Sequence, residues 1–187
     1  MTTRVPWVEV SMVRETLAGL PVVPLPSGFS LRRYRRGDDR TWTRIQQEAE
    51  RYHEITPALF HREFGGGEAE LSERQIFLCD AAGREIGTGT AWFNDDYHGQ
   101  AWGRIHWVAI AADLQRRGLG RALVSALCQR FLELRHLRAY LTTESVRLPA
   151  LKLYLSFGFR PEIKHDADRR EWEVLRARGL RWNSSAA

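Results

Sequence analysis

The residues of this chain that are best suited to chemistry lie in one short segment, residues 115–122, with the sequence QRRGLGRA. Apolar residues recur at helical spacing from Leu119 to Leu134, which predicts a long helix that begins near Gly118. The first N–H groups of a helix have no partner within it, and the helix dipole is positive at that end. Glycine lets an outside group approach this backbone, and three arginines add positive charge. The segment therefore suits a bound phosphate, although two glycines alone favour the other interpretation, a capped and solvated helix start.

The residues before this segment give the structural context of its two glycines. Residues 104–110, RIHWVAI, are β-branched and aromatic enough to form a buried strand, and a short link from Ala111 to Leu114 joins them to the glycines. A Rossmann dinucleotide site needs a third glycine, and a P-loop needs Gly-Lys-Ser/Thr after a longer spacer. The sequence has neither pattern here, so the two glycines do not by themselves identify a cofactor class.

Two ordered matches connect this region to a known family. Val108-Ala109-Ile110, followed by QRRGLGRAL at 115–123, resembles the acetyl-CoA signature Q/R-x-x-G-x-G/A of the GNAT superfamily of N-acetyltransferases. The run ALKLYLSFGF at 150–159 resembles a later helix and strand of the superfamily, A-x-x-L-Y-x-x-x-G-F. The two matches in this order are more specific than either alone. With the strand between them, they cover residues 104 to about 161.

The resemblance implies how the cofactor, acetyl-CoA, would bind, without a metal. The strand carrying Val108 and the strand ending near Thr143 would splay apart, and the pantetheine arm would enter the gap. Backbone N–H groups of the glycine segment would contact the pyrophosphate, and an N–H near Val108 or Ala109 would stabilise the oxyanion. The expected cofactor-binding residues are Val108, Ala109, Ile110, Gln115, Arg116, Arg117, Gly118, Leu119, Gly120, Arg121 and Ala122.

Tyr154, in the second match, is the expected general acid. A phenol, with an ordinary pKa of about 10, can protonate a departing thiolate whose ordinary pKa is about 8.5. From the residues alone, an aromatic side chain that is half-buried on an amphipathic helix with Leu151, Leu155 and Phe157 is the alternative. The resemblance favours the catalytic role.

His106 is the candidate general base. It precedes Val108 by two residues on a predicted strand, so regular alternation puts both side chains on one face. An ordinary pKa of about 6.5 suits proton removal at neutral pH. A histidine at this place resembles one used in arylalkylamine-acetylating members of the superfamily. A packed core histidine is an equally weighted alternative.

Two positions depart from the superfamily pattern. Arg104 stands where many members carry a glutamate that acts as base, and Arg147 stands where an asparagine often contacts the cofactor. The first departure argues against a base on that part of the strand and leaves Glu144 as the fallback. The second puts one cofactor contact in doubt, although Pro149 still defines the helix start.

The acceptor site has no motif. Asp95, Asp96 and His98 lie in a predicted polar loop over 94–100, which could border the acceptor or be solvated surface. Large aromatic side chains could wall a pocket for an apolar or aromatic amine, or fill the core. They are Trp92, Trp102 and Trp107.

Composition limits the remaining classes. At 187 residues, with 43% hydrophobic residues, the chain suits one compact domain. Its formal net charge of +5 comes from scattered basic residues with no nucleic-acid-binding motif, so no nucleic acid is expected. No run is long enough to span a membrane, and the N-terminus lacks a signal peptide core, so a cytoplasmic location is expected. Cys79 and Cys128 have no metal-type spacing and are expected to be buried apolar residues.

The predicted function is direct transfer of an acetyl group from acetyl-CoA to a primary amine of a small molecule or a peptide, in a ternary complex. The alternative is a non-catalytic acyl-CoA-binding sensor, which the departures at Arg104 and Arg147 keep open. A homodimer is also left open.

The expected fold class is α/β (α+β): a mixed, mostly antiparallel central sheet of about six to seven strands, flanked by helices and splayed between the fourth and fifth strands. One domain is expected over residues 28–178, after an extended arm over 1–27 that holds a short helix near 13–20, and before a tail over 179–187. Strands are expected at 28–34, 74–80, 85–93, 104–110, 138–143, from 159, and at 171–176. Helices are expected at 39–53, from 56 to just before the glycines at 65–67, from about 118, and at 149–158.

Overall fold

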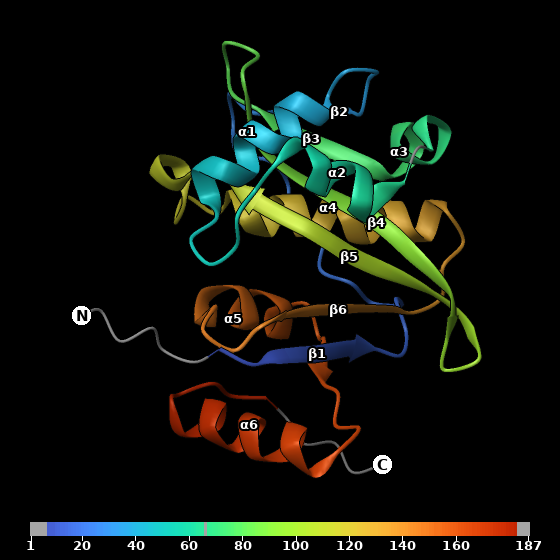
Figure 1. The fold of residues 1–187 in the computed structure, drawn as a ribbon, viewed down its shortest axis with the longest axis vertical. Coiled ribbons are helices and arrows are strands. Elements are labelled where there is room, and N and C mark those ends of the chain that lie inside the picture. The colour runs from blue at the N-terminus through green and yellow to red at the C-terminus, as the bar shows by residue number, and fades with distance from the viewer. Residues whose placement is uncertain (1–6, 66, 183–187) are drawn as a thin grey trace.

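A single seven-stranded sheet organises the chain in the computed structural model, which describes residues 7–65 and 67–182 (Figure 1). The strand order is β2-β3-β4-β5-β6-β1-β7. Neighbouring strands are antiparallel except for β5 and β6, which are parallel. The strands are β1 (Glu9–Arg14), β2 (Ser30–Arg33), β3 (Gln75–Cys79), β4 (Glu85–Tyr97), β5 (Gln100–Ile110), β6 (Ala139–Glu144) and β7 (Arg160–Pro161).

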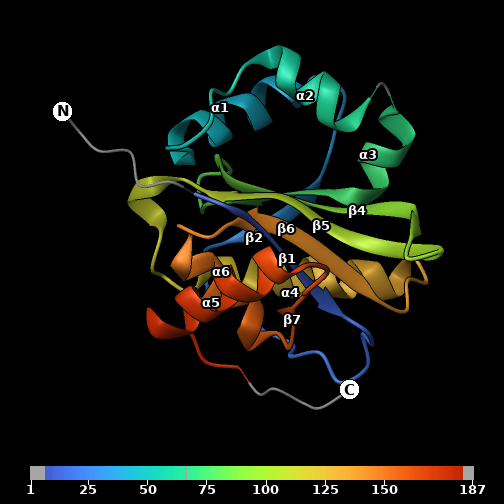
Figure 2. The same cartoon turned by 60° about the horizontal axis from the view of Figure 1, so that its bottom comes forward.

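Helices cover both faces of the sheet. The helices are α1 (Asp39–Ala49), α2 (Pro57–Phe64), α3 (Glu68–Arg74), α4 (Leu119–Glu133), α5 (Leu148–Ser156) and α6 (Asp166–Ala177). Figure 2 shows α1, α2 and α3 on one side of the sheet and α4 and α5 on the other. None of the helices in the part of the chain that the structure describes has the length and apolarity needed to cross a membrane.

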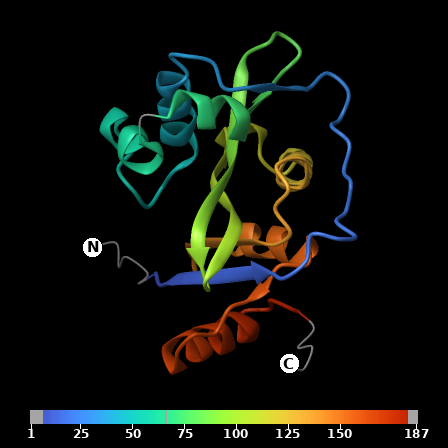
Figure 3. The ribbon, with the colours of Figure 1, turned by 90° about the vertical axis from the view of Figure 1, so that its right-hand side faces the viewer.

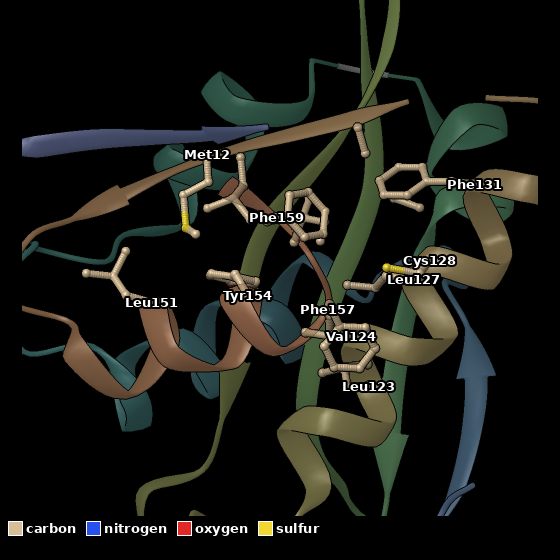
Figure 4. Close-up of a cluster of buried hydrophobic side chains, with 14 of the residues drawn as sticks. Met12, Leu123, Val124, Leu127, Cys128, Phe131, Leu151, Tyr154, Phe157 and Phe159 are labelled. Carbon is tan, nitrogen blue, oxygen red and sulfur yellow. The ribbon is translucent and has the colours of Figure 1, made fainter. Parts of the chain in front are cut away.

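Each face has its own buried cluster. Under α1 and α2 the cluster is aromatic, with Trp42 in edge contact with Phe60, Phe64 and Trp107. On the opposite face, α4 and α5 pack against the central strands through a mainly aliphatic core (Figure 4). That core includes Met12, Leu123, Val124, Leu127, Cys128, Phe131, Leu151, Tyr154, Phe157 and Phe159.

The sheet splits between β5 and β6. The two strands pair only at Gly103 with Ala139 and at Arg104 with Tyr140, after which they diverge. The side view in Figure 3 shows the long β4–β5 hairpin running from the region of α1 and α2 down to β1. The expected splay between the strand of Val108 and the strand that ends near Thr143 is therefore confirmed, as is the mixed, mostly antiparallel sheet.

The N-terminal region differs from the expected short helix over 13–20. Residues Glu9–Arg14 form β1, which lies between β6 and β7 in the sheet. Val10 and Met12 alternate toward the core and are buried, which is the pattern of a strand with one covered face. The helix prediction is wrong because it relied on residues beyond Arg14 and ignored this alternation.

The C-terminal region also differs. The strand expected over 171–176 is the last part of helix α6, in which Trp172 and Leu175 are the buried residues. Their spacing of three is helical, and a capping box between His165 and Asp168 begins the helix. Of the predicted tail, Leu180 is buried and Trp182 lies edge-on to Trp172, while residues 183–187 lie outside the described residues.

Two further segments are more regular than expected. The predicted polar loop over 94–100 belongs largely to the β4–β5 hairpin, whose turn is only His98 and Gly99. Helix α3 precedes β3 and was not expected at all, because its seven residues contain only one buried side chain, Leu71. A segment so short and polar has too little apolar periodicity to signal a helix.

Candidate active site

The glycine segment forms an open cradle at the start of α4. Gly118 is the N-cap residue and has a φ of 80°, which a residue with a side chain rarely adopts. The N–H groups of Arg121 and Ala122 bond to the Gly118 carbonyl, 3.0 and 3.3 Å away. Within the described residues, the N–H groups of 115–120 have no such partner. A row of free donors at a helix N-terminus suits an anionic ligand.

Gly120 keeps the cradle open. It lies inside the first turn of α4, where a Cβ atom would meet only Leu153 Cδ2, at an ordinary 3.5 Å. The fold itself therefore does not require glycine here. Arg116, Arg117 and Arg121 are exposed around the cradle, and Arg121 Nη1 donates to Ser156 Oγ at 3.1 Å. These residues fit a phosphate group, as the sequence predicts.

A bulge distorts β5 just where the sheet splits. The register between β4 and β5 shifts between Thr88 and Thr90, and Trp107 has a φ of 49°. Positive φ at a bulky residue is a strained conformation that surrounding contacts must hold. One such contact is the buried Gln46, whose Nε2 donates to the Trp107 carbonyl at 2.9 Å.

The bulge overturns one expectation about side-chain direction. Regular alternation would put His106 and Val108 on the same face, but an extra residue between them shifts the alternation. His106 lies toward α2, with its ring 5.4 Å from that of Phe64, whereas Val108 packs against the core on the α4 side. The prediction that both side chains share a face is wrong.

A cavity of about 440 Å³ occupies the split between β5 and β6. It brings together four of the predicted site residues, His106, Val108, Ala109 and Tyr154. Ile110 and residues 115–122 are not among its lining. The other lining residues that matter below are Gln46, Glu50, His53, Arg62, Glu63, Arg104, Trp107, Glu144 and Arg147.

Tyr154 lines the cavity from α5. It is buried against the aliphatic core, with its ring 6.2 Å from that of Phe159 (Figure 4). Burial raises the pKa of its phenol, so the hydroxyl stays protonated at neutral pH. Within the described residues this hydroxyl has no hydrogen-bond partner, so it is free to donate to a ligand.

His106 lies beside Glu63 in the cavity wall. His106 is buried, and its Nε2 atom lies 3.4 Å from Glu63 Oε2. Burial lowers the pKa of His106 to about 4, an effect that Glu63 opposes and the Arg104 guanidinium reinforces. The imidazole is therefore neutral at neutral pH, and its pKa lies well below the ordinary value of about 6.5 that would suit a general base.

Glu63 is the carboxylate at the centre of this face. The close contact with His106 and the hydrogen bond from Trp107 lower the pKa of Glu63 to about 2, so it is ionised. Trp107 Nε1 donates to Glu63 Oε2 at 3.0 Å. The side chain is about a quarter exposed, at 24%, and lies in the cavity wall. An ionised carboxylate held in this way can bind a cation.

An ion-pair network joins the two sides of the cavity mouth. Arg147 Nη2 lies 2.6 Å from Glu50 Oε2, and Arg147 Nε also pairs with Glu144. His53 Nε2 lies 2.6 Å from Glu144 Oε1. The Arg147 guanidinium lies 5.0 Å from the ring centre of Tyr52. Arg147, which departs from the superfamily asparagine, thus links α5 to the end of α1, and Glu144 is engaged by both neighbours.

The other acceptor candidates lie elsewhere. Asp95, Asp96 and His98 do not line the cavity, and His98 pairs with Glu162 near β7. Of the three tryptophans considered above, only Trp107 lines the cavity. Among the described residues, no cluster of three or more His, Cys, Asp or Glu is arranged to hold a metal ion.

From the sequence, the choice of acceptor was expected to lie around residues 51–67 and 94–102, but no single residue that α1 and α2 supply to the site was identified. Gln46, Glu50, His53 and Glu63 come from segments without a motif, and their role depends on contacts with β5 and α5 that are distant in sequence. The Thr56 cap and Pro57 at the start of α2 did predict the helix that carries Glu63. No sequence signal pointed to the residue itself.

The sequence of this chain is similar to those of known acetyltransferases. The family model described as the acetyltransferase (GNAT) family matches residues 38–159. A mycothiol acetyltransferase from Actinosynnema mirum is 31% identical over 160 residues, covering 81% of this chain and 51% of that protein. A mycothiol acetyltransferase from Pseudarthrobacter chlorophenolicus is also 31% identical, over 149 residues, covering 76% and 46%. The chain thus spans about half the length of the curated relatives it matches.

Solved structures agree on the fold. A GCN5-related N-acetyltransferase from Sphaerobacter thermophilus superposes with a TM-score of 0.69 at 20% identity, covering 82% of this chain and 48% of that one. The ribosomal-protein-S18-alanine N-acetyltransferase from Escherichia coli superposes with a TM-score of 0.59 at 20% identity, covering 72% and 79%. At these identities the likeness concerns the fold.

Proposed function

Because this chain belongs to the GNAT family of acetyltransferases, we propose that it transfers the acetyl group of acetyl-CoA to a primary amine of a small molecule or a peptide. The observation that carries the proposal is the split between β5 and β6, because it joins a cavity lined by Tyr154 and His106 to a strand that leads into the open N–H cradle. A single ligand could place an anionic end in the N–H cradle and a reactive end in the cavity.

Acetyl-CoA would lie along β5. The free N–H groups of 115–120 would hold its pyrophosphate, with Arg116, Arg117 and Arg121 adding positive charge. The pantetheine would follow Val108 to Ile110, where β5 has lost β6 as a hydrogen-bonding neighbour. A backbone N–H at Val108 or Ala109, beside the bulge, is the proposed donor to the oxyanion.

The reaction exchanges a thioester for an amide. The lone pair of the amine nitrogen forms the new C–N bond, the C–S electron pair leaves with sulfur, one proton leaves nitrogen and one proton is taken up by sulfur. Tyr154 is the proposed proton donor to sulfur, since its phenol is protonated and free. His106 is the proposed proton acceptor, acting as a neutral imidazole of low basicity, so water is expected to carry the proton onward.

Release of free thiol from acetyl-CoA tests this function. The assay uses the purified chain with a panel of small amines, amino acids and peptides with free N-termini. We expect thiol release with at least one amine and formation of the matching acetamide by mass spectrometry. Acetyl-CoA binding by calorimetry without thiol release for any acceptor would instead favour the acyl-CoA-binding sensor.

The wider setting of the protein is part of this proposal. We propose a cytoplasmic location, no nucleic-acid partner and no membrane partner. The cavity and the cradle described above are built within one chain, so the proposed reaction does not require a homodimer.

A further inference from the structure

The three arginines in the cavity wall differ in what they contact. Arg147 is paired with Glu50 and Glu144, and Arg62, which is largely exposed, lies 3.7 Å from Glu63. Arg104 has no ion-pair partner within the described residues, and its Nε atom is buried without a hydrogen-bond partner. A buried guanidinium N–H without a partner is costly unless a ligand compensates it.

Arg104 is placed to meet a ligand at the narrow end of the split. It forms the last pair between β5 and β6, with Tyr140, and its Cζ atom lies 5.9 Å from the ring centre of that residue. At this distance the cation–π attraction between the Tyr140 ring and the guanidinium is weak. The guanidinium group can bind a carboxylate or a phosphate through two hydrogen bonds. The cavity therefore contains a cation in its wall that the chain does not neutralise.

Glu63 provides the opposite charge in the same cavity. Trp107 Nε1 and His106 Nε2 both face its Oε2 atom, so Oε1 remains directed elsewhere, with only Arg62 at 3.7 Å. Arg104 and His106 precede the bulge and lie two residues apart on β5, so their side chains share a face about 7 Å apart along the strand. A small molecule can span an interval of this order.

We propose that the acetyl acceptor is a small zwitterion, whose ammonium group binds Glu63 and whose anionic group, a carboxylate or a phosphate, binds Arg104. Before attack the ammonium group gives up one proton, through water and His106 to solvent, so that the nitrogen presents its lone pair to the thioester. The inference rests on the proposed function and specifies its acceptor. Glu63 and Arg104 do not form an ion pair with each other, so each keeps its charge for the ligand. An amine without an anionic group would leave the buried Arg104 Nε–H without a partner, which is how the site would discriminate against it.

Matched pairs of acceptors test the proposal. The carboxylate arm compares β-alanine with β-alaninamide and L-leucine with L-leucinamide, and the phosphate arm compares phosphoethanolamine with ethanolamine. We expect the anionic member of at least one pair to have a kcat/KM about 10- to 100-fold higher than its neutral partner. The arm that shows this preference identifies the anionic group.

Substitutions connect the preference to the two side chains. Arg104→Met should bring the ratio of the kcat/KM values within the pair close to one. Arg138→Met is the matched control, because the Arg138 Cζ atom also lies over an aromatic ring, 5.4 Å from Trp102, but outside the cavity lining. Glu63→Gln should raise the acceptor KM about 10- to 100-fold and leave the acetyl-CoA KM unchanged. Glu85→Gln is its control, since Glu85 has a similar exposure of 26% and lies outside the lining.

The outcomes separate this inference from the proposed function. Turnover by the wild type without preference for the anionic acceptors, or a preference that survives Arg104→Met in a folded variant, would overturn the zwitterion. A fall in melting temperature for Arg104→Met with an unchanged preference would assign Arg104 a structural role. Absence of thiol release for every acceptor would instead overturn the proposed function. Melting temperatures of all variants keep misfolding distinct from lost recognition.

Discussion

The proposed cofactor site and the proposed acceptor site are built by different chemical means. On the cofactor side, backbone N–H groups of 115–120 and an open Gly120 form the cradle at the end of a helix anchored in the aliphatic core. On the proposed acceptor side, polar side chains such as Glu63, His53 and Glu50 line the cavity from α2, the segment after α1 and the end of α1. Backbone recognition constrains the local sequence, whereas side-chain recognition depends on how distant segments pack. The first kind can be detected in a sequence, and the second mostly cannot.

The largest effect on turnover should come from Tyr154, which lies between the proposed cofactor site and the proposed acceptor site. Tyr154→Phe removes a hydroxyl that has no partner among the described residues, so the fold and both substrate sites should persist. Loss of a general acid should lower kcat by about 100-fold or more. Steady-state kinetics should show this loss, with calorimetry giving an unchanged acetyl-CoA affinity. Unchanged turnover would mean that the thiolate receives its proton elsewhere.

The next effect concerns the acid stability of the acceptor side. The pKa of His106 is lowered to about 4 in the fold against about 6.5 in the unfolded chain, so between these values the unfolded chain binds more protons. Stability from this group is fully present above about pH 6.5 and is lost as the pH falls to about 4, by about 3 kcal/mol.

Urea unfolding at pH 7 and pH 4.5 checks this sign. The fall in unfolding free energy should be smaller for His106→Gln than for the wild type, because the variant has no imidazole to protonate at this position. His136, whose pKa is also lowered by burial, is present in both proteins and cancels in the comparison. Equal falls in the two proteins would show that His106 is not buried in neutral form.

A smaller effect is expected at the contact that joins the two sides. Gln46→Leu leaves the Trp107 carbonyl without its donor and should destabilise the protein by about 1–3 kcal/mol. Because the bulge orients both His106 and Val108, the KM values of both substrates should rise. Gln47→Leu is the control, since Gln47 Nε2 makes a similar bond, at 2.9 Å, to Ile55 O instead. A rise in only one KM for Gln46→Leu would mean that the bulge serves one side alone.

The smallest effect should be confined to the cradle. Gly120→Val places a branched side chain where a ligand would approach, and we expect acetyl-CoA affinity to fall about tenfold. Gly120→Ala is the milder control, because its Cβ meets only Leu153 Cδ2 at 3.5 Å and alanine favours a helix. Calorimetry with acetyl-CoA measures both. Equal affinities for all three proteins would remove the cradle from the cofactor site.

The sequence predicted most of the region that contains the two motifs. The strand before the glycines, the helix start at Gly118, the helix of Tyr154 and the splay follow from local patterns and from the family resemblance. Strand β1 was not predicted, because its partners, β6 and β7, are more than a hundred residues away. Helix α6 was misread because Trp172 and Val174 alternate like a strand, although Val174 is exposed.

In the candidate site, too, the residues in the two motifs could be predicted, and the contacts between distant segments could not. Tyr154, His106, Val108 and Ala109 do line one cavity. The bulge at Trp107 was not predictable, because an L residue at positive φ gives no composition signal. The low pKa of His106 and the contact with Glu63 both arise from burial beneath α2, which only the packed structure defines.

Paired Michaelis constants for two variants test the division of the cleft most directly. With an accepted amine in hand, the KM for acetyl-CoA and the KM for the acceptor are measured for Gly120→Val and Glu63→Gln. We predict that Gly120→Val raises only the acetyl-CoA KM, by about tenfold, and that Glu63→Gln raises only the acceptor KM, by about 10- to 100-fold. If both variants raised the same constant, the assignment of one substrate to each side would be contradicted.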